Sequence, residues 1–202
     1  NYLKEVGGLI LDWDKDNYAT SYDVQLSDDG NEWSTAYTFT NGNGGRDYVY
    51  LPEKDARVLK INFRKSKSGK GYGITRLQVM EPEFSQSPND FFKALAKESP
   101  KGYYPKYFLN QQCYWTIVGT SSDTKEALIN ETGAIEVDQL RFSLEPFLYV
   151  DDKLITWNDV SLKQSLMNDY LPIPSVVWRY GGLELTVRAF SAGAEGRSLL
   201  TA

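Results

Sequence analysis

Residues 19–33, ATSYDVQLSDDGNEW, decide how the first part of the chain folds. Apolar side chains recur at every second position of this stretch, at Tyr22, Val24 and Leu26. This period of two is typical of a strand with one buried face. The dipeptide Asp29-Gly30 follows, and both residue types tolerate the backbone angles of tight turns. The stretch therefore predicts a strand that ends in a turn.

The same pattern extends on both sides of this stretch. Four further strand-like runs are 9–13, 48–51, 57–63 and 74–80. Glycine-rich pauses separate them, at 41–45 and 66–73. Short strands with a turn signal about every 10 residues are typical of sandwiches and jelly rolls. We therefore expect an all-β first domain over residues 1–84.

One segment carries helical signals. Ser87 is a suitable N-cap for a helix that starts at Pro88. An apolar stripe at helical spacing follows, formed by Phe91, Phe92 and Leu95. We predict that residues 85–102 form a helical connector whose aromatic stripe joins two strand-rich halves.

Strand signals return over residues 103–202. Predicted strands cover 107–118, 142–150, 154–157 and 176–190. Turns are expected at Asp151-Asp152 and at Gly181-Gly182. These patterns predict a second, antiparallel β-sandwich. Residues 197–202 begin like a strand and stop within its apolar pattern, without a turn or a polar tail. We therefore expect a piece of a longer protein. Its exposed strand edges could then pair with another copy of the chain.

Composition excludes several function classes. Twenty-two Lys and Arg face 27 Asp and Glu, a net charge of −5, which argues against a nucleic-acid binder. The chain has no histidine, which excludes Ser-His-Asp and Cys-His catalysis and histidine-bound zinc. Carboxylates that could serve glycoside hydrolysis are Glu131, Glu136, Asp138, Glu145, Asp151, Asp152 and Asp159. Because such residues in strand and turn regions are usually solvated, we predict no catalytic residue in this chain.

Three motifs resemble those of discoidin domains, also called coagulation-factor type C (F5/8 type C) domains. They are 19–33 itself, Ala56-Arg57-Val58-Leu59-Lys60-Ile61, and Gly73-Ile74-Thr75-Arg76-Leu77-Gln78-Val79. The resemblance covers residues 5–80 and only the C-terminal two-thirds of such a domain. It implies a truncated galactose-binding-like jelly roll. Bacterial members of this family are commonly sugar-binding modules of glycoside hydrolases, which implies an extracytoplasmic location.

The second half resembles another family more loosely. Segments 154–160 and 177–187 are similar to the β super-sandwich that precedes the (α/α)6 barrel of large carbohydrate-active enzymes. Together the resemblances imply a non-catalytic, glycan-binding part of a bacterial glycoside hydrolase. The alternative is that both domains are a structural scaffold for a downstream barrel. No cofactor is expected.

Sugar binding needs an aromatic face and a few fixed polar groups, which loops between strands can supply. The candidate ligand-binding residues are Asn43, Arg46, Asp47 and Tyr72, in or beside the two glycine-rich loops. Trp13 and Trp33 occupy strand positions that the discoidin resemblance assigns to the core. The expected partner is a neutral or acidic glycan.

The segment from Arg57 to Arg76 is basic, with no acidic residue. Lysines on an edge strand can prevent pairing with another sheet. Alternatively, the segment attracts an anionic glycan or anionic lipid headgroups. Lipid binding is not expected, because the loops lack the apolar tips that the resemblance would require. Members of this family often hold a structural calcium ion with a glutamate in their last strand. Arg76 stands where that glutamate would be, and its positive charge would repel calcium, so we predict no metal in this chain.

Overall fold

The computed structural model describes residues 4–121, 126–138, 142–194 and 197–201. Contacts divide the chain into two compact units, Asn1–Glu98 and Ser99–Ala202. Strands dominate both units, and every strand pair in the described residues is antiparallel. The all-β prediction is confirmed.

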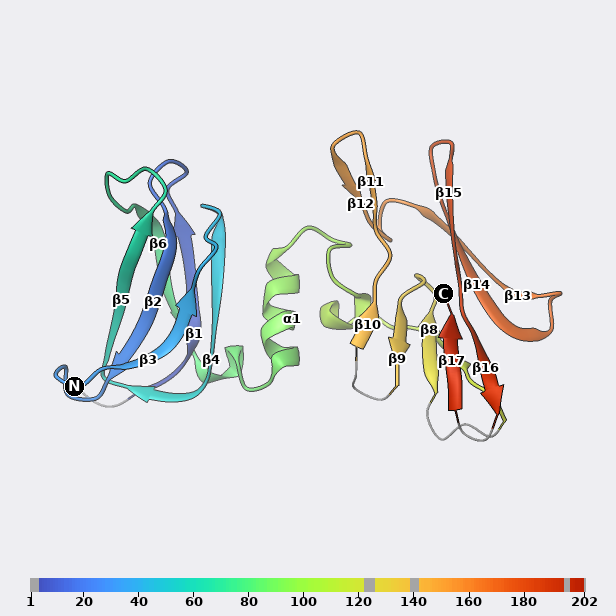
Figure 1. Cartoon of the computed structure of the whole chain (residues 1–202), viewed down its shortest axis with the longest axis horizontal. Coiled ribbons are helices and arrows are strands. Elements are labelled where there is room, and N and C mark those ends of the chain that lie inside the picture. The colour runs from blue at the N-terminus through green and yellow to red at the C-terminus, as the bar shows by residue number, and fades with distance from the viewer. Residues whose placement is uncertain (1–3, 122–125, 139–141, 195–196, 202) are drawn as a thin grey trace. The chain divides into compact units, whose positions relative to one another are not determined.

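The first unit contains two three-stranded sheets (Figure 1). Its strands are β1 (Lys4–Trp13), β2 (Ala19–Ser27), β3 (Ser34–Phe39), β4 (Arg46–Ala56), β5 (Val58–Ser66) and β6 (Ile74–Met80). One sheet has the order β4-β1-β6 and the other β3-β2-β5, so β1 and β2 are the central strands. Their apolar residues form one buried core, which includes Leu9, Leu11, Trp13, Tyr22 and Val24.

The stretch at 19–33 folds as its pattern predicts. Tyr22 and Val24 are fully buried on the core face of β2. The turn is held by Asp29, whose Oδ1 accepts hydrogen bonds from the backbone N–H groups of Asn31 (2.8 Å) and Glu32 (3.0 Å). Gly30 has a φ of 82°, a left-handed conformation that glycine adopts without steric cost. The turn therefore depends on both residues of the Asp29-Gly30 dipeptide.

Helix α1 spans Pro88–Glu98 and follows a short 3₁₀ helix, η1 (Pro82–Phe84). Ser87 caps it as predicted, since its Oγ accepts a hydrogen bond from the backbone N–H of Asp90 at 3.2 Å. The Phe91 ring packs edge-on against Tyr50 and Phe84, which both belong to the first unit. The aromatic stripe of the helix therefore contacts the first sandwich.

The second unit begins with a 3₁₀ helix, η2 (Lys106–Leu109), and contains short strands. These are β7 (Trp115–Val118), β8 (Ala127–Asn130), β9 (Ile135–Val137), β10 (Phe142–Leu144), β11 (Leu148–Val150), β12 (Lys153–Ile155), β13 (Ser161–Met167), β14 (Leu171–Tyr180), β15 (Leu183–Arg188), β16 (Phe190–Ala194) and β17 (Arg197–Thr201). Sheets of order β10-β9-β8-β7 and β13-β14-β15 contribute to a core that contains Ile129, Ile135, Val176 and Trp178.

Predicted turns in this unit are confirmed, whereas one predicted strand is too long. Asp151 and Asp152 have φ angles of 48° and 58°, and Gly181 has a φ of 56°. The strand expected at 107–118 begins only at Trp115, because η2 occupies its first residues. Asn110 ends η2 in the left-handed conformation, which interrupts the extended backbone.

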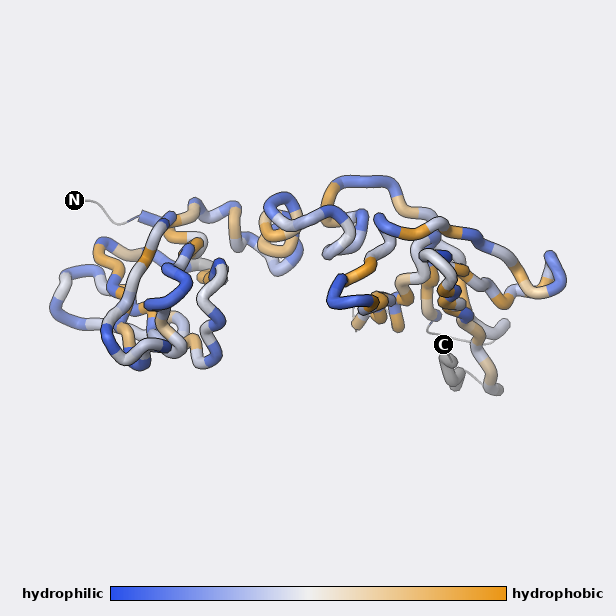
Figure 2. Tube along the Cα trace, turned by 90° about the horizontal axis from the view of Figure 1, so that it is seen from above, coloured by the Kyte–Doolittle hydropathy of each residue, from blue (hydrophilic) through white to orange (hydrophobic). Residues whose placement is uncertain are grey.

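Short hydrophobic and short hydrophilic stretches follow one another along the whole described trace (Figure 2).

Within the described residues, no helix has the length and apolar character needed to cross a membrane.

Candidate functional site

Two loops meet the same end of β1. The backbone N–H of Trp13 donates to the Gly45 carbonyl (3.3 Å), and that of Asp14 donates to the Gly73 carbonyl (2.8 Å). Because β1 lies between β4 and β6, residues 43–46 and 71–73 flank its final residues on either side. The structure thus brings the loops of three predicted site residues, Asn43, Arg46 and Tyr72, to one end of the unit.

Asn43 is exposed and shapes the first loop. Its Oδ1 accepts a hydrogen bond from the backbone N–H of Gly45 at 2.9 Å. Gly44 has a φ of 78°, and a Cβ there would lie 2.5 Å from the Tyr18 ring. Glycine is therefore required both by the backbone conformation and by the close packing of the tyrosine.

Arg46 is held by carboxylates of its own unit. Its Nε contacts Asp12 Oδ1 at 2.5 Å, its Nη2 donates to Asp12 Oδ2 at 2.9 Å, and its Nη1 pairs with Glu98 at the end of α1. The hydrogen bonds from Arg46 lower the pKa of Asp12. About a third of the Arg46 side chain (32%) remains exposed, so a ligand would meet a guanidinium that already carries two carboxylates.

Asp47 faces the core, unlike the surface position expected of a ligand-binding residue. It is 5% exposed, and its Oδ2 accepts hydrogen bonds from Trp13 Nε1 (2.7 Å) and the Tyr22 hydroxyl (3.0 Å). Burial raises the pKa of Asp47, although both hydrogen bonds act in the opposite direction. In this structure Asp47 is the acceptor for two buried donors. The buried position of Asp47 could have been predicted from strand alternation, because Asp47 shares its face of β4 with the buried Val49 and Leu51.

Tyr72 presents an aromatic surface at the second loop. Its ring stacks on Phe63 with a centroid separation of 4.6 Å and an interplanar angle of 22°. Phe63 in turn contacts the Trp13 ring edge-on at 5.9 Å. Tyr72 is 39% exposed. One face of its ring is therefore supported by Phe63, and part of the ring stays accessible to a ligand.

The two tryptophans assigned to the core differ in position. Trp13 is 5% exposed and belongs to the core cluster, as expected. Trp33 is only half-buried and lies outside that cluster, which corrects the assignment. Lys60 Nζ lies 3.9 Å from the centroid of the Trp33 ring, a cation–π contact. Trp33 directly precedes β3, and its ring contacts an exposed lysine of β5 instead of the core.

The basic segment runs along β5, an edge strand of the β3-β2-β5 sheet, and continues through the following loop into β6. One of its members has a structural partner: Arg64 Nε donates to the fully buried carboxylate of Asp23 at 2.7 Å. Burial raises the pKa of Asp23, but hydrogen bonds from Thr38 and Arg64 outweigh it, and the net shift is downward. Asp23 alternates with the core residues Tyr22 and Val24, so its position in β2 alone would predict a solvent-exposed carboxylate. The carboxylate is buried instead, and Arg64 compensates its charge.

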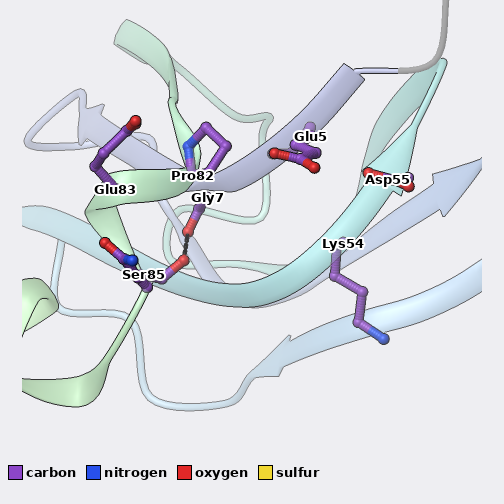
Figure 3. Close-up of a pocket in the computed structure, with 9 residues that line it drawn as sticks. Glu5, Gly7, Lys54, Asp55, Pro82, Glu83 and Ser85 are labelled. Carbon is purple, nitrogen blue, oxygen red and sulfur yellow. Dashed lines mark hydrogen bonds between the residues drawn. The ribbon is translucent and has the colours of Figure 1, made fainter.

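A pocket of about 360 Å³ lies near the start of β1, among residues of β1, β4 and the segment 82–86 (Figure 3). Glu5 and Asp55 are direct partners across β1 and β4, and Glu83 lies at the same pocket. Ser85 Oγ donates to the carbonyls of Gly7 and Leu51 beside it. None of the predicted ligand-binding residues lines this pocket.

Metal ligands do not cluster in the described part of the chain: it contains no group of three or more Cys, Asp or Glu residues placed to hold an ion. Arg76, at the position where the resemblance would require a glutamate, donates from Nη2 to Gln78 Oε1 at 2.6 Å. That no metal binds stays a prediction.

Comparison with known proteins finds one family match, within the first unit. The model of the F5/8 type C domain matches residues 3–76, which confirms the resemblance expected over residues 5–80. The resemblance of residues 103–202 to a β super-sandwich stays a prediction. No curated protein matches the chain.

Two solved structures are similar to it, both derived from the chitosanase/glucanase of Paenibacillus sp. IK-5. Chitosan-binding module 2, in complex with chitotriose, is 25% identical to this chain, with a TM-score of 0.37, and the match covers 39% of this chain. Chitosan-binding module 1 is 28% identical, also with a TM-score of 0.37, and shares 40%. The chain spans 63% and 62% of these two modules.

Proposed function

We propose that the first unit, which contains the F5/8 type C match, recognises a glycan and performs no catalysis. The observation that carries this proposal is the exposed Tyr72 ring, which stacks on Phe63 at the same end of the unit as the 43–46 loop. A fixed aromatic face suits the C–H face of a sugar ring, and neighbouring polar groups suit its hydroxyls. The module would hold a larger, extracytoplasmic glycoside hydrolase on its polysaccharide.

The polar groups of the 43–46 loop are prearranged. Asn43 is fixed by its hydrogen bond to Gly45, and Arg46 by Asp12 and Glu98. Fixed side chains lose little conformational entropy when a ligand binds, which favours affinity for a weakly interacting sugar. Asp47 is not part of the proposed contact surface, because its carboxylate serves the core.

A structural scaffold is the second candidate. The observation that favours it is the pairing of Arg46 with Glu98, which ties the first loop to the last residue of α1. In this role Arg46 positions the helix and contacts no ligand.

Glycan binding by the full chain separates the two candidates. We expect Tyr72→Ala to weaken binding by about 1–2 kcal/mol through the loss of an aromatic contact. Tyr103→Ala is the matched control, because Tyr103 is 45% exposed but belongs to the other unit. Isothermal titration against neutral and acidic polysaccharides measures both variants. Absence of saturable binding, or equal binding by the Tyr72 variant and the control, would favour the scaffold.

A further inference from the structure

The second unit contains a pocket of about 310 Å³ between two of its sheets. It lies among β7, β8, β13 and β14, far in sequence from the loops of the first unit. Its volume is at the lower end of small-ligand sites, about 300–1,000 Å³. The lining residues that matter here are Tyr114, Thr116, Asn130, Glu131, Gln164 and Leu166.

The turn after β8 builds one wall of the pocket. Asn130 Oδ1 accepts three hydrogen bonds, from the Thr132 N–H (2.9 Å), the Thr132 hydroxyl (2.8 Å) and the Ala134 N–H (2.9 Å). Gln164 Nε2, on β13, donates to the Glu131 carbonyl at 3.0 Å and so joins the turn to the facing sheet. These bonds hold the polar groups of the wall in place without a ligand.

The charge at the pocket is compensated. The Glu131 carboxylate pairs with Lys106 Nζ at 2.9 Å and accepts a hydrogen bond from the Tyr114 N–H at 2.9 Å. Burial raises the pKa of Glu131, but these contacts outweigh it and lower the pKa overall, so the carboxylate is ionised at neutral pH. No Lys or Arg is among the lining residues. An anionic ligand would find no free cation there, whereas a neutral one meets no electrostatic penalty.

One buried donor at this wall has no partner. Asn130 is 2% exposed, and its Nδ2 lacks a hydrogen-bond acceptor among the described residues. An unpaired buried donor is costly, so its presence at the wall of a pocket calls for an explanation. Two other lining residues offer accessible surface: Tyr114 is 66% exposed and Leu166 is 38% exposed. The pocket thus combines hydroxyl and amide groups with aromatic and aliphatic surface.

We propose that this pocket binds one residue of a neutral sugar, with Tyr114 stacking on its C–H face and Glu131 and Gln164 facing its hydroxyls. This site is separate from the one proposed in the first unit and does not depend on it. If both sites bind, one chain contacts a polysaccharide at two points, and its effective affinity increases through the second, intramolecular contact.

Nuclear magnetic resonance of the full ¹⁵N-labelled chain tests the proposal. The probes are hexaoses of cellulose, starch, xylan and mannan, with oligogalacturonate as the anionic comparison. We expect saturable shifts at the amides of Tyr114, Glu131 and Gln164 with at least one neutral probe and weaker or no shifts with oligogalacturonate.

Three variants locate the binding. Tyr114→Ala should weaken it roughly 3- to 10-fold, the loss of one aromatic contact. Tyr149→Ala is the control, because Tyr149 is 71% exposed and does not line the pocket. Thr116→Phe fills the pocket, because Thr116 lines it from an exposed position of β7 on the same strand face as Tyr114. This variant should abolish the shifts, and it keeps the test valid if the Tyr114 variant folds poorly.

Each outcome separates this proposal from the function proposed for the first unit. Shifts confined to residues 43–46 and 72 would overturn the second pocket and support the first. Absence of shifts at the second pocket with every neutral probe at millimolar concentration would overturn this proposal. Absence of shifts in both places, with oligogalacturonate as well, would overturn both proposals. Shifts at Tyr114 that persist in Thr116→Phe would also overturn the second pocket, because the ligand would then lie outside it.

Discussion

Asp47 provides the sharpest test of how the first unit is built. The substitution Asp47→Ala removes the acceptor of two buried donors, Trp13 Nε1 and the Tyr22 hydroxyl. Trp13 is 5% exposed and Tyr22 is fully buried, so water cannot replace the carboxylate without opening the core. Each buried donor left unpaired costs about 1–3 kcal/mol. We therefore expect a loss of about 2–6 kcal/mol, against a typical domain stability of about 5–15 kcal/mol.

Asp47→Asn is the matched control. Both donors use the same oxygen, Oδ2, so the amide oxygen of asparagine can accept both bonds. This variant should lose much less stability than the alanine variant. Because Asp47 faces the core, glycan affinity should be unchanged in Asp47→Asn.

The pH dependence follows from the raised pKa of Asp47. Above its ordinary value of 3.8, the folded state retains a proton that the unfolded state has released. The contribution of Asp47 to stability therefore decreases as pH rises from about 4 through the raised pKa. Asparagine does not titrate, so Asp47→Asn should gain stability relative to wild type over this interval.

Urea unfolding, followed by the Trp13 indole N–H signal in nuclear magnetic resonance, reports on the first unit alone. Repeating it between pH 4 and 8 measures the predicted trend. An alanine variant with the wild-type midpoint would refute the assignment of Asp47 to the core. Equal losses in the alanine and asparagine variants would show that the shared acceptor is not what stabilises the site.

Three further predictions concern other parts of the chain. Trp13→Ala should destabilise the first unit by roughly 3–5 kcal/mol, as large core truncations do, and Trp33→Ala by clearly less, because Trp33 is only half-buried; equal urea midpoints for the two would contradict this. The Asp29 carboxyl should titrate at a pKa of about 2, held low chiefly by backbone N–H donors, and a carboxyl-carbon titration near 4 would contradict the turn geometry. Gly102→Ala should lower the melting temperature of the second unit, because φ there is 100° and the added Cβ would lie 2.0 Å from Thr156 Oγ1; unchanged melting would argue against this packing.

The sequence by itself determined the elements that depend on neighbouring residues. The alternation at 19–33 and the Asp29-Gly30 turn appear as β2 and its turn. Ser87 predicted the start of α1, and Gly181-Gly182 the turn between β14 and β15. These features follow from backbone preferences and local hydrogen bonds, which a short stretch of residues contains in full.

The residues of the candidate site were only partly accessible from sequence. The glycine-rich loops pointed to Asn43, Arg46 and Tyr72, which the structure brings to one end of β1. The glycine-rich loop just before it suggested a ligand-binding role for Asp47. Asp47 lies two residues before Val49 in β4, and this spacing already placed it on the buried face of the strand. Neighbours in a strand point to opposite faces, so closeness in sequence does not imply a shared site.

Only the tertiary structure decided which distant side chains meet. Trp13 and Tyr22 share Asp47 because β1, β2 and β4 contribute to one core, and Arg64 reaches Asp23 across 41 positions. Tyr114 and Gln164 line one pocket because β7 and β13 belong to facing sheets of the second unit. Strand pairing and sheet packing depend on burial over the whole unit, and each strand's local pattern is compatible with several partners.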